Sequence, residues 1–273
     1  MNKPIGVFDS GYGGLTVLSE IMKTLPAFDY MYLGDNARAP YGTRSYETVY
    51  RYTLQCVKWL FDQGCPLVIL ACNTASAKAL RSIQQNDLDR IAPGKRVLGV
   101  IRPTSEIIGN YTGSGHIGIF GTPGTVNSES YLIEINKFWP EISVTQEACP
   151  MWVPLIENNE FDKAGADYFV KKNIQNLLNK DPEIDSVLLA CTHYPLMIKQ
   201  IEANLPRNVR AISQGEIVAK SLAAYLERHA EIKEKCSKGG TRQYFTTGST
   251  EDFEIQARLF TGCEISAGHV DLA

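Results

Sequence analysis

The sequence predicts an α/β fold made of two similar halves, each built on a mainly parallel β-sheet. Three observations lead to this prediction: short apolar runs alternate with longer segments of helical period, most of these runs are apolar throughout, and two motifs recur at nearly one offset. A strand that is apolar on both faces is typical of a sheet covered on both sides. Strand–helix alternation at this spacing is typical of parallel sheets in α/β proteins.

Each element follows from its local pattern. The clearest helix follows Ser45, because apolar side chains recur every three or four residues from Tyr46 to Phe61 before Gly64 and Pro66 end the pattern. The expected strands are 5–8, 30–33, 67–71, 97–101, 117–120, 142–145, 187–190, 209–212 and 243–246. The other expected helices are 14–24, 75–85, 125–138, 163–179, 196–204, 216–236 and 250–260, the last with Ser249 as its N-cap.

Two segments of the chain resemble two later segments. The motif IGVFDS at 5–10 recurs as IGIFGT at 117–122, and VILACNT at 68–74 recurs as VLLACTH at 187–193. The order is the same and the offsets are 112 and 119 residues. This repetition predicts two halves of similar fold.

Composition and charge narrow the class of protein. The 273 residues are 44% hydrophobic and 21% charged, with a formal net charge of −3, so the chain is an ordinary globular one without the basic excess that binds nucleic acid or an anionic membrane. No apolar run approaches the ~18 residues of a membrane span. The seven cysteines form no CxxC pair, so we expect neither a disulfide framework nor a metal site, and we expect a cytoplasmic protein with free thiols.

Polar residues follow the expected strands, where ligands of open α/β sheets bind. The glycine-rich turn Gly11–Gly14 matches neither a P-loop nor a dinucleotide fingerprint. Two interpretations of it stay open. The turn brings Asp9 and Ser10 to a small anionic ligand, or its glycines only let a helix and a strand pack closely.

Two cysteines, Cys72 and Cys191, end equivalent strands of the two halves. Each is expected at a helix N-terminus, which would lower a thiol pKa by about one unit from ~8.5. One thiol on each side of a carbon atom suits a reaction between mirror-image molecules, since one thiolate removes a proton and the opposing thiol returns one. Asp9 and His193 could exchange protons with Cys72 and Cys191. Glu157 is a further candidate, with a solvated carboxylate at a helix start as the alternative.

Five motifs then carry a family resemblance. They are Asp9-Ser10-Gly11-x-Gly13-Gly14-Leu15-Thr16-Val17, Gly34-Asp35-Asn36-Ala37-Arg38-x-Pro40-Tyr41-Gly42, Ala71-Cys72-Asn73-Thr74-Ala75-Ser76-Ala77, Cys149-Pro150 with Val153-Pro154-Leu155, and Cys191-Thr192-His193-Tyr194-Pro195-Leu196. In order and spacing they resemble the bacterial glutamate racemases of the Asp/Glu racemase family.

The resemblance implies a cofactor-independent racemase that interconverts L- and D-glutamate and supplies D-glutamate for peptidoglycan. Cys72 would act on the D-enantiomer and Cys191 on the L-enantiomer. It also implies a homodimer, with a first domain at 1–98 plus 208–273, a second at 99–207 and the active site between them. The residues that it implies at the substrate are Asp9, Ser10, Pro40, Tyr41, Gly42, Asn73, Thr74, Thr122, Thr192 and His193.

Two alternatives to this function remain open. One is a racemase or isomerase for aspartate or another small acid, which would share the two cysteines. The other is a non-catalytic module that binds a dicarboxylate, with Cys72 and Cys191 as packed core thiols.

Overall fold

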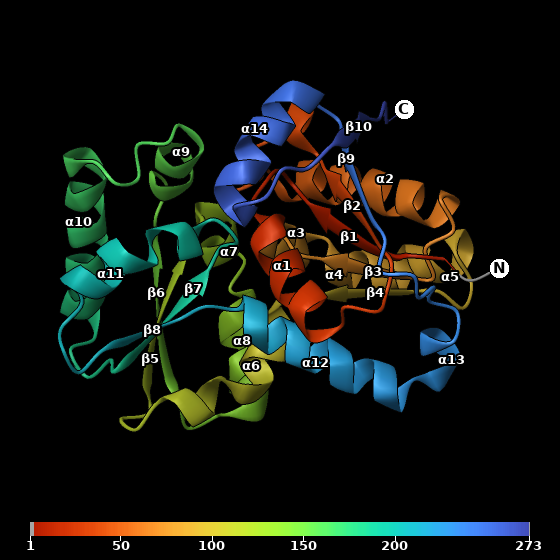
Figure 1. Ribbon diagram of the computed structural model, residues 1–273. Helices are drawn as coiled ribbons and strands as arrows, with labels where there is room; N and C mark the ends of the chain where they lie inside the picture. The colour runs from red at the N-terminus through yellow and green to blue at the C-terminus, as the bar shows by residue number, and fades with distance from the viewer. Residues whose placement is uncertain (1–2, 273) are drawn as a thin grey trace.

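Two parallel β-sheets lie side by side in the computed structural model, which describes residues 3–272. One sheet has six strands in the order β10-β9-β2-β1-β3-β4 and the other has four in the order β6-β5-β7-β8 (Figure 1). Every pairing within both sheets is parallel. The predicted α/β fold with two mainly parallel sheets is therefore confirmed.

The strands of each sheet come from distinct parts of the chain. The six-stranded sheet contains β1 Ile5–Asp9, β2 Tyr30–Gly34, β3 Leu67–Leu70, β4 Arg96–Gly99, β9 Arg242–Thr246 and β10 Ala267–His269. The four-stranded sheet contains β5 His116–Gly121, β6 Ser143–Ala148, β7 Ser186–Ala190 and β8 Arg210–Ile212. Both chain ends lie at the six-stranded sheet (Figure 1).

Helices and short helical turns connect these strands. The α-helices are α1 Gly14–Thr24, α2 Tyr46–Asp62, α3 Asn73–Lys78, α4 Leu80–Ser82, α5 Leu88–Ile91, α6 Ile101–Ile107, α7 Pro123–Asn127, α8 Ser130–Phe138, α9 Trp152–Glu157, α10 Ala164–Lys180, α11 Ile198–Asn204, α12 Gly215–Arg228, α13 Ala230–Lys233 and α14 Thr250–Thr261. The 3₁₀ turns are η1 Asn36–Arg38, η3 Ile108–Tyr111 and η4 Tyr194–Met197, and η2 Ile83–Asp87 is a π-helical turn.

The two halves repeat one topology. Strands β2-β1-β3-β4 of the first sheet and β6-β5-β7-β8 of the second have the same order along the chain and across the sheet. The recurring motifs fall on equivalent strands, since IGVFDS contains β1 and IGIFGT contains all of β5 except His116, while VILACNT begins in β3 and VLLACTH in β7. The predicted internal repeat is therefore present, and Cys72 and Cys191 follow equivalent strands.

Helices cover both faces of the six-stranded sheet, which explains its continuous apolar strands. Val7 packs in one apolar cluster with Leu18 and Ile21 of α1. The next residue, Phe8, points to the opposite face and packs in a second cluster with Val57 and Leu60 of α2. Successive strand residues alternate between the faces, so the middle of a strand buried on both faces is apolar, and a polar residue such as Asp9 of β1 stands at its end.

The structure corrects several expected boundaries. The strand expected at 97–101 ends at Gly99, because α6 begins at Ile101. The helix expected at 125–138 is divided into α7 and α8 by Glu129, whose φ of 54° is left-handed. The helix expected at 75–85 begins at Asn73 and continues irregularly through α4 and η2, and the helix expected at 216–236 is interrupted at His229.

Strand pairing also corrects part of the expected domain division. The expected first domain includes residues 208–212, yet β8 pairs with β7 in the four-stranded sheet. The chain returns to the first half only at α12, which packs against α1. We therefore propose a first domain of 1–98 plus 213–273 and a second domain of 99–212.

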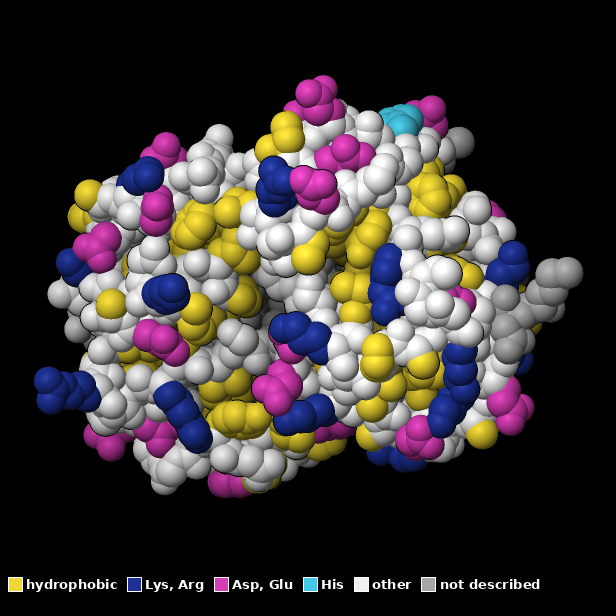
Figure 2. Space-filling model, in the orientation of Figure 1, with side chains coloured by type: hydrophobic (Ala, Val, Ile, Leu, Met, Phe, Trp, Pro, Cys, Tyr) yellow, Lys and Arg dark blue, Asp and Glu magenta, His cyan; other side chains and the backbone are white. Residues whose placement is uncertain are grey.

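Two further observations concern the charge on the surface and the presence of membrane-spanning helices. On the face shown in Figure 2, lysine and arginine side chains are interspersed with acidic ones. Among residues 3–272, no helix has both the length and the apolar character needed to span a membrane.

Candidate active site

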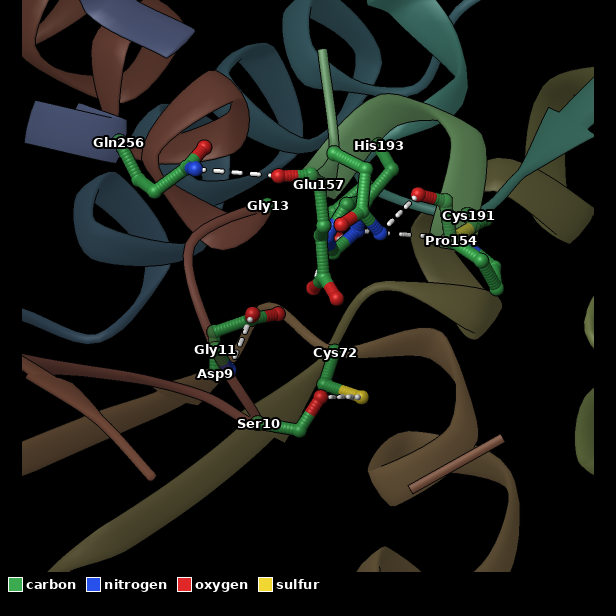
Figure 3. A network of polar contacts seen from close by, with 12 residues as sticks. Asp9, Ser10, Gly11, Gly13, Cys72, Pro154, Glu157, Cys191, His193 and Gln256 are labelled. Atoms are coloured by element: carbon green, nitrogen blue, oxygen red, sulfur yellow. Dashed lines mark hydrogen bonds and ion pairs between the residues drawn. The ribbon is translucent and has the colours of Figure 1, made fainter. Parts of the chain in front are cut away.

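The two cysteines lie where the carboxyl ends of the two sheets approach each other. Figure 3 shows Cys72, Asp9 and Ser10 on one side, and Cys191 and His193 on the other. A charge on Cys191 is near enough to raise the pKa of Cys72. Both cysteine side chains are buried, with 6% and 7% of Cys72 and Cys191 exposed. The structure therefore brings the two predicted thiols together from separate halves.

Cys72 caps the N-terminus of α3 with its own sulfur. Its Sγ accepts a hydrogen bond from the Ala75 backbone N–H at 3.4 Å and lies 3.4 Å from Ser10 Oγ. Burial nevertheless raises the pKa of the Cys72 thiol to about 12, and the nearby Asp9 carboxylate adds to the rise. The predicted lowering of the Cys72 pKa is thus wrong, because loss of solvation outweighs the helix N-terminus. Cys72 rests as a neutral thiol.

Asp9 is fully buried at the end of β1. Its Oδ2 accepts a hydrogen bond from the Gly11 N–H at 2.9 Å, and its Oδ1 has no close hydrogen-bond partner among the described residues. Burial raises the pKa of Asp9, although the neighbouring His193 opposes the rise. A buried carboxylate oxygen without a partner is suited to accept a proton or an ammonium group.

His193 connects Cys191 to Glu157. Its Nδ1 lies 3.9 Å from Cys191 Sγ and its Nε2 lies 3.0 Å from Glu157 Oε1. Burial disfavours the charge on His193, but the interactions with Cys191 and Glu157 outweigh it and raise the pKa of His193 to about 10. The imidazolium is therefore favoured at neutral pH. Glu157 ends α9 rather than starting a helix, so the alternative of a solvated helix-start carboxylate is wrong.

Threonine hydroxyls form a second cluster between the halves. Thr74 Oγ1 lies 2.9 Å from Thr122 Oγ1, and Thr122 caps α7 through the Thr125 N–H at 3.2 Å. The carbonyl oxygen of Thr192 accepts a hydrogen bond from Thr16 Oγ1 at 2.9 Å, which also joins the two halves. The predicted residues Thr74, Thr122 and Thr192 are thus all at the junction.

The side chains of two predicted substrate residues form hydrogen bonds with other protein groups. Tyr41 is buried and its hydroxyl donates to Asp35 Oδ2, while both side-chain polar atoms of Asn73 bind protein groups. The sequence placed Asp35 in a motif without giving it a role. It is a fully buried carboxylate whose two oxygens also accept from Arg38 Nε at 2.9 and 2.8 Å. The side chains of Tyr41 and Asn73 are thus held in place by neighbouring protein groups.

Pro40 and Gly42 lie on either side of Tyr41 in the same loop. The Ala39–Pro40 peptide bond is cis, and the Gly42 carbonyl accepts a hydrogen bond from the Gly124 N–H of the other half at 2.7 Å. Pro40 and Gly42 therefore belong to the loop that reaches across to the second half.

Gly13 explains the glycine-rich turn. A Cβ at Gly13 would lie 2.3 Å from Thr192 Oγ1 and 2.4 Å from His193 Nδ1, and one at Gly14 would lie 2.5 Å from the Asp9 Cβ. The φ of Gly13 is −58°, so its conformation does not require glycine. Glycine is required here because neighbouring atoms approach so closely. Both interpretations of the glycine-rich turn therefore apply, since the close packing also brings Asp9 and Ser10 to the junction.

Metal-ligand geometry is not found in the described part of the chain. Among residues 3–272, no group of three or more His, Cys, Asp or Glu side chains lies close enough to hold a metal ion.

The fold and the site together define a class of protein: a two-lobed α/β protein with one buried thiol from each lobe at the shared junction. The sequence profile of the Asp/Glu/hydantoin racemases matches residues 5–222. The glutamate racemase of Ruegeria sp. (strain TM1040) is 41% identical over 272 residues, covering 96% of this chain and 98% of that protein. The chain belongs to the glutamate racemase family.

Solved structures of the family have the same fold. The glutamate racemase isoform RacE1 from Bacillus anthracis matches with a TM-score of 0.89 and 36% identity, over 99% of this chain and 98% of that one. The glutamate racemase from Francisella tularensis, solved in complex with D-glutamate, matches with a TM-score of 0.87 and 32% identity over the same shares.

Proposed function

We propose that this protein interconverts L- and D-glutamate by direct proton transfer at the α-carbon and so supplies D-glutamate for peptidoglycan synthesis. One observation carries the mechanism: equivalent strands of two equivalent halves are each followed by a buried cysteine, and these cysteines share one junction. The Francisella tularensis glutamate racemase, solved in complex with D-glutamate, supports the choice of substrate.

In this mechanism, two thiols exchange one proton each with the substrate. Cys191 acts as a thiolate, removes the α-proton of L-glutamate and becomes a thiol. Cys72 delivers its own proton to the opposite face of the resulting carbanion, which gives D-glutamate and leaves Cys72 as the thiolate. The resting charges suit this direction, because Cys72 is a neutral thiol and the His193 imidazolium lies 3.9 Å from the Cys191 sulfur. The reverse reaction begins with an ionised Cys72, and Asp9 accepts the proton that Cys72 gives up.

Backbone and hydroxyl groups hold the substrate in this proposal. The first N–H groups of α3, at Asn73 and Thr74, have no acceptor within their helix and can bind a carboxylate. The Thr74–Thr122 hydroxyl pair lies beside them. In the direction from L- to D-glutamate, where Asp9 is not called on to accept the Cys72 proton, its Oδ1 can accept a hydrogen bond from the substrate ammonium group.

An exchange experiment in D₂O tests the two-thiol mechanism. Wild-type protein is expected to place deuterium at the α-carbon of the D-glutamate formed from L-glutamate. The Cys72→Ser variant is expected to lose racemisation strongly while still exchanging the α-proton of L-glutamate, because Cys191 remains. The Cys191→Ser variant is expected to show the opposite preference and to exchange only D-glutamate.

The controls separate substrate, mechanism and cofactor. Cys263→Ser, which removes an exposed thiol, is expected to leave turnover unchanged. Full racemisation by either active-site variant would overturn the two-thiol mechanism, and faster turnover of aspartate than of glutamate would overturn the substrate. Activity is expected without pyridoxal phosphate and in the presence of EDTA.

The proposal also covers the cellular compartment and the oligomeric state of the enzyme. Seven cysteines without a disulfide suit a reducing compartment, so we place the protein in the cytoplasm. We also propose a homodimer, for which sedimentation velocity over a range of protein concentrations is the direct test.

A further inference from the structure

A closed ring of hydrogen bonds lies buried beside Cys72. Asn73 Nδ2 donates to Gln214 Oε1 at 2.8 Å, Gln214 Nε2 donates to the Tyr131 hydroxyl, and this hydroxyl donates to Asn73 Oδ1 at 2.5 Å. Gln214 Nε2 also donates to Thr104 Oγ1 at 3.0 Å. All four side chains are buried, at 4% exposure or less.

The ring joins four separate elements of the fold. Asn73 is the first residue of α3, Tyr131 lies in α8, Thr104 lies in α6, and Gln214 immediately precedes α12. Gln214 therefore stands where the chain leaves the four-stranded sheet and returns to the first half. The ring fixes the start of α3, and with it Cys72, against the elements at this crossing.

Each atom of the Gln214 amide has a defined role in the ring. Its oxygen accepts from Asn73, and its two N–H bonds point to Tyr131 and Thr104. Thr104 Oγ1 already donates its own proton to the Val100 carbonyl at 3.0 Å, so it can only accept from residue 214. Burial raises the pKa of Tyr131, which keeps its hydroxyl protonated as the donor to Asn73.

We infer that Gln214 is a positioning residue for racemisation, which holds Asn73 and thereby aims the Cys72 thiol at the substrate. The inference rests on the proposed function. An amide is required at this position, because a carboxylate cannot donate to Thr104 and would draw the Tyr131 proton away from Asn73. Breaking the ring leaves buried polar groups without partners, and the first turn of α3 shifts to satisfy them.

The test replaces Gln214 by its isosteric acid. The Gln214→Glu variant is expected to lose about 10- to 100-fold in kcat at pH 8, the size of loss expected for a misplaced catalytic group. Activity relative to wild type is expected to recover as the pH falls, since a protonated glutamic acid regains one donor. Glu216→Gln is the matched control, because this exposed pair with Lys220 lies in the next turn and makes no contact with the ring.

A second variant keeps the test decisive if Gln214→Glu does not fold. Tyr131→Phe removes one hydroxyl from the ring and is expected to lower kcat similarly, with no recovery at low pH. A kcat that equals wild type at every pH in either folded variant would overturn the inference, whatever the change in Tm. Wild-type turnover of glutamate is measured in the same series, so failure of the proposed function would show there and not in the variants.

Discussion

Gly13→Ala tests whether contact between the halves places His193. The added methyl group would lie 2.3 Å from Thr192 Oγ1 and 2.4 Å from His193 Nδ1. Non-bonded heavy atoms normally stay about 3.5 Å apart, so these groups must move by roughly 1 Å. A displacement of about 1 Å costs a catalytic group about 100-fold in rate, which is about 2.7 kcal/mol in the barrier.

We expect the stability of the Gly13→Ala variant to change much less than its activity. Alanine fits the backbone at Gly13, where φ is −58° and ψ is −34°, so the change gains about 0.4–1 kcal/mol from the unfolded chain, which offsets part of the cost of moving Thr192 and His193. We therefore expect kcat/KM to fall about 100-fold while Tm stays near the wild-type value.

The assay follows racemisation from both enantiomers by circular dichroism. L- and D-glutamate have equal free energies, so the equilibrium constant is one and kcat/KM must fall equally in the two directions. Gly165→Ala is the matched control, since a Cβ there meets no atom within 4 Å. Wild-type kcat/KM in Gly13→Ala would refute the reasoning that this contact positions His193.

Two further predictions concern charge. Asp9→Asn is expected to lower the pKa of Cys72 from about 12, because the carboxylate helps to raise it, and to slow racemisation roughly 100-fold. Alkylation of Cys72 followed by mass spectrometry should then begin at lower pH, and an unchanged profile would contradict the prediction. Burial tends to raise the pKa of Asp181, but its interactions with His116, the Glu183 N–H and Thr145 together outweigh burial and lower this pKa. The ionised carboxylate therefore stabilises the fold above pH ~4, and this contribution is lost as the pH falls further. Asp181→Asn should cost about 1 kcal/mol at pH 7 in urea unfolding, and a cost that persisted at pH 3 would contradict the reasoning.

The sequence predicted elements well where one local signal dominates. The apolar stripe of α2 was predicted, and the helix follows Ser45 as expected, with Ser45 Oγ accepting from the Thr48 N–H at 3.3 Å. The N-cap of α14 was also predicted, with Ser249 Oγ accepting from the Asp252 N–H at 3.1 Å.

The helices and the strand that were not predicted have local sequence patterns that are weak or that argue against them. Helices α6 and α9 were not predicted, and each has a proline, Pro103 and Pro154, in its first turn. Proline is tolerated there because those N–H groups lack a helical acceptor, although the same residue usually argues against a helix. Strand β10, Ala267–His269, was not predicted because three residues with a central glycine form no apolar run.

The candidate site was predicted as a set of residues but not as a set of contacts. Glu157 meets His193 across 36 positions and Asn73 meets Gln214 across 141, and no local pattern encodes such pairs. The direction of the Cys72 pKa was mispredicted for a related reason. The helix N-terminus is visible in the sequence, whereas the burial that outweighs it depends on the whole fold.

The late return of the chain to the six-stranded sheet determines when the molecule can mature during synthesis. The four-stranded sheet has all its strands once Ile212 has left the ribosome, but β9 pairs with β2 only after residues 242–246 emerge. The same stretch delivers Thr247, whose hydroxyl donates to Asp35 at 2.7 Å and so completes the support of the loop that carries Tyr41. A nascent chain therefore completes the four-stranded sheet before the six-stranded sheet. A chain whose synthesis stops before residue 242 contains both thiols but lacks β9 and Thr247, so the loop that carries Tyr41 is not fully supported.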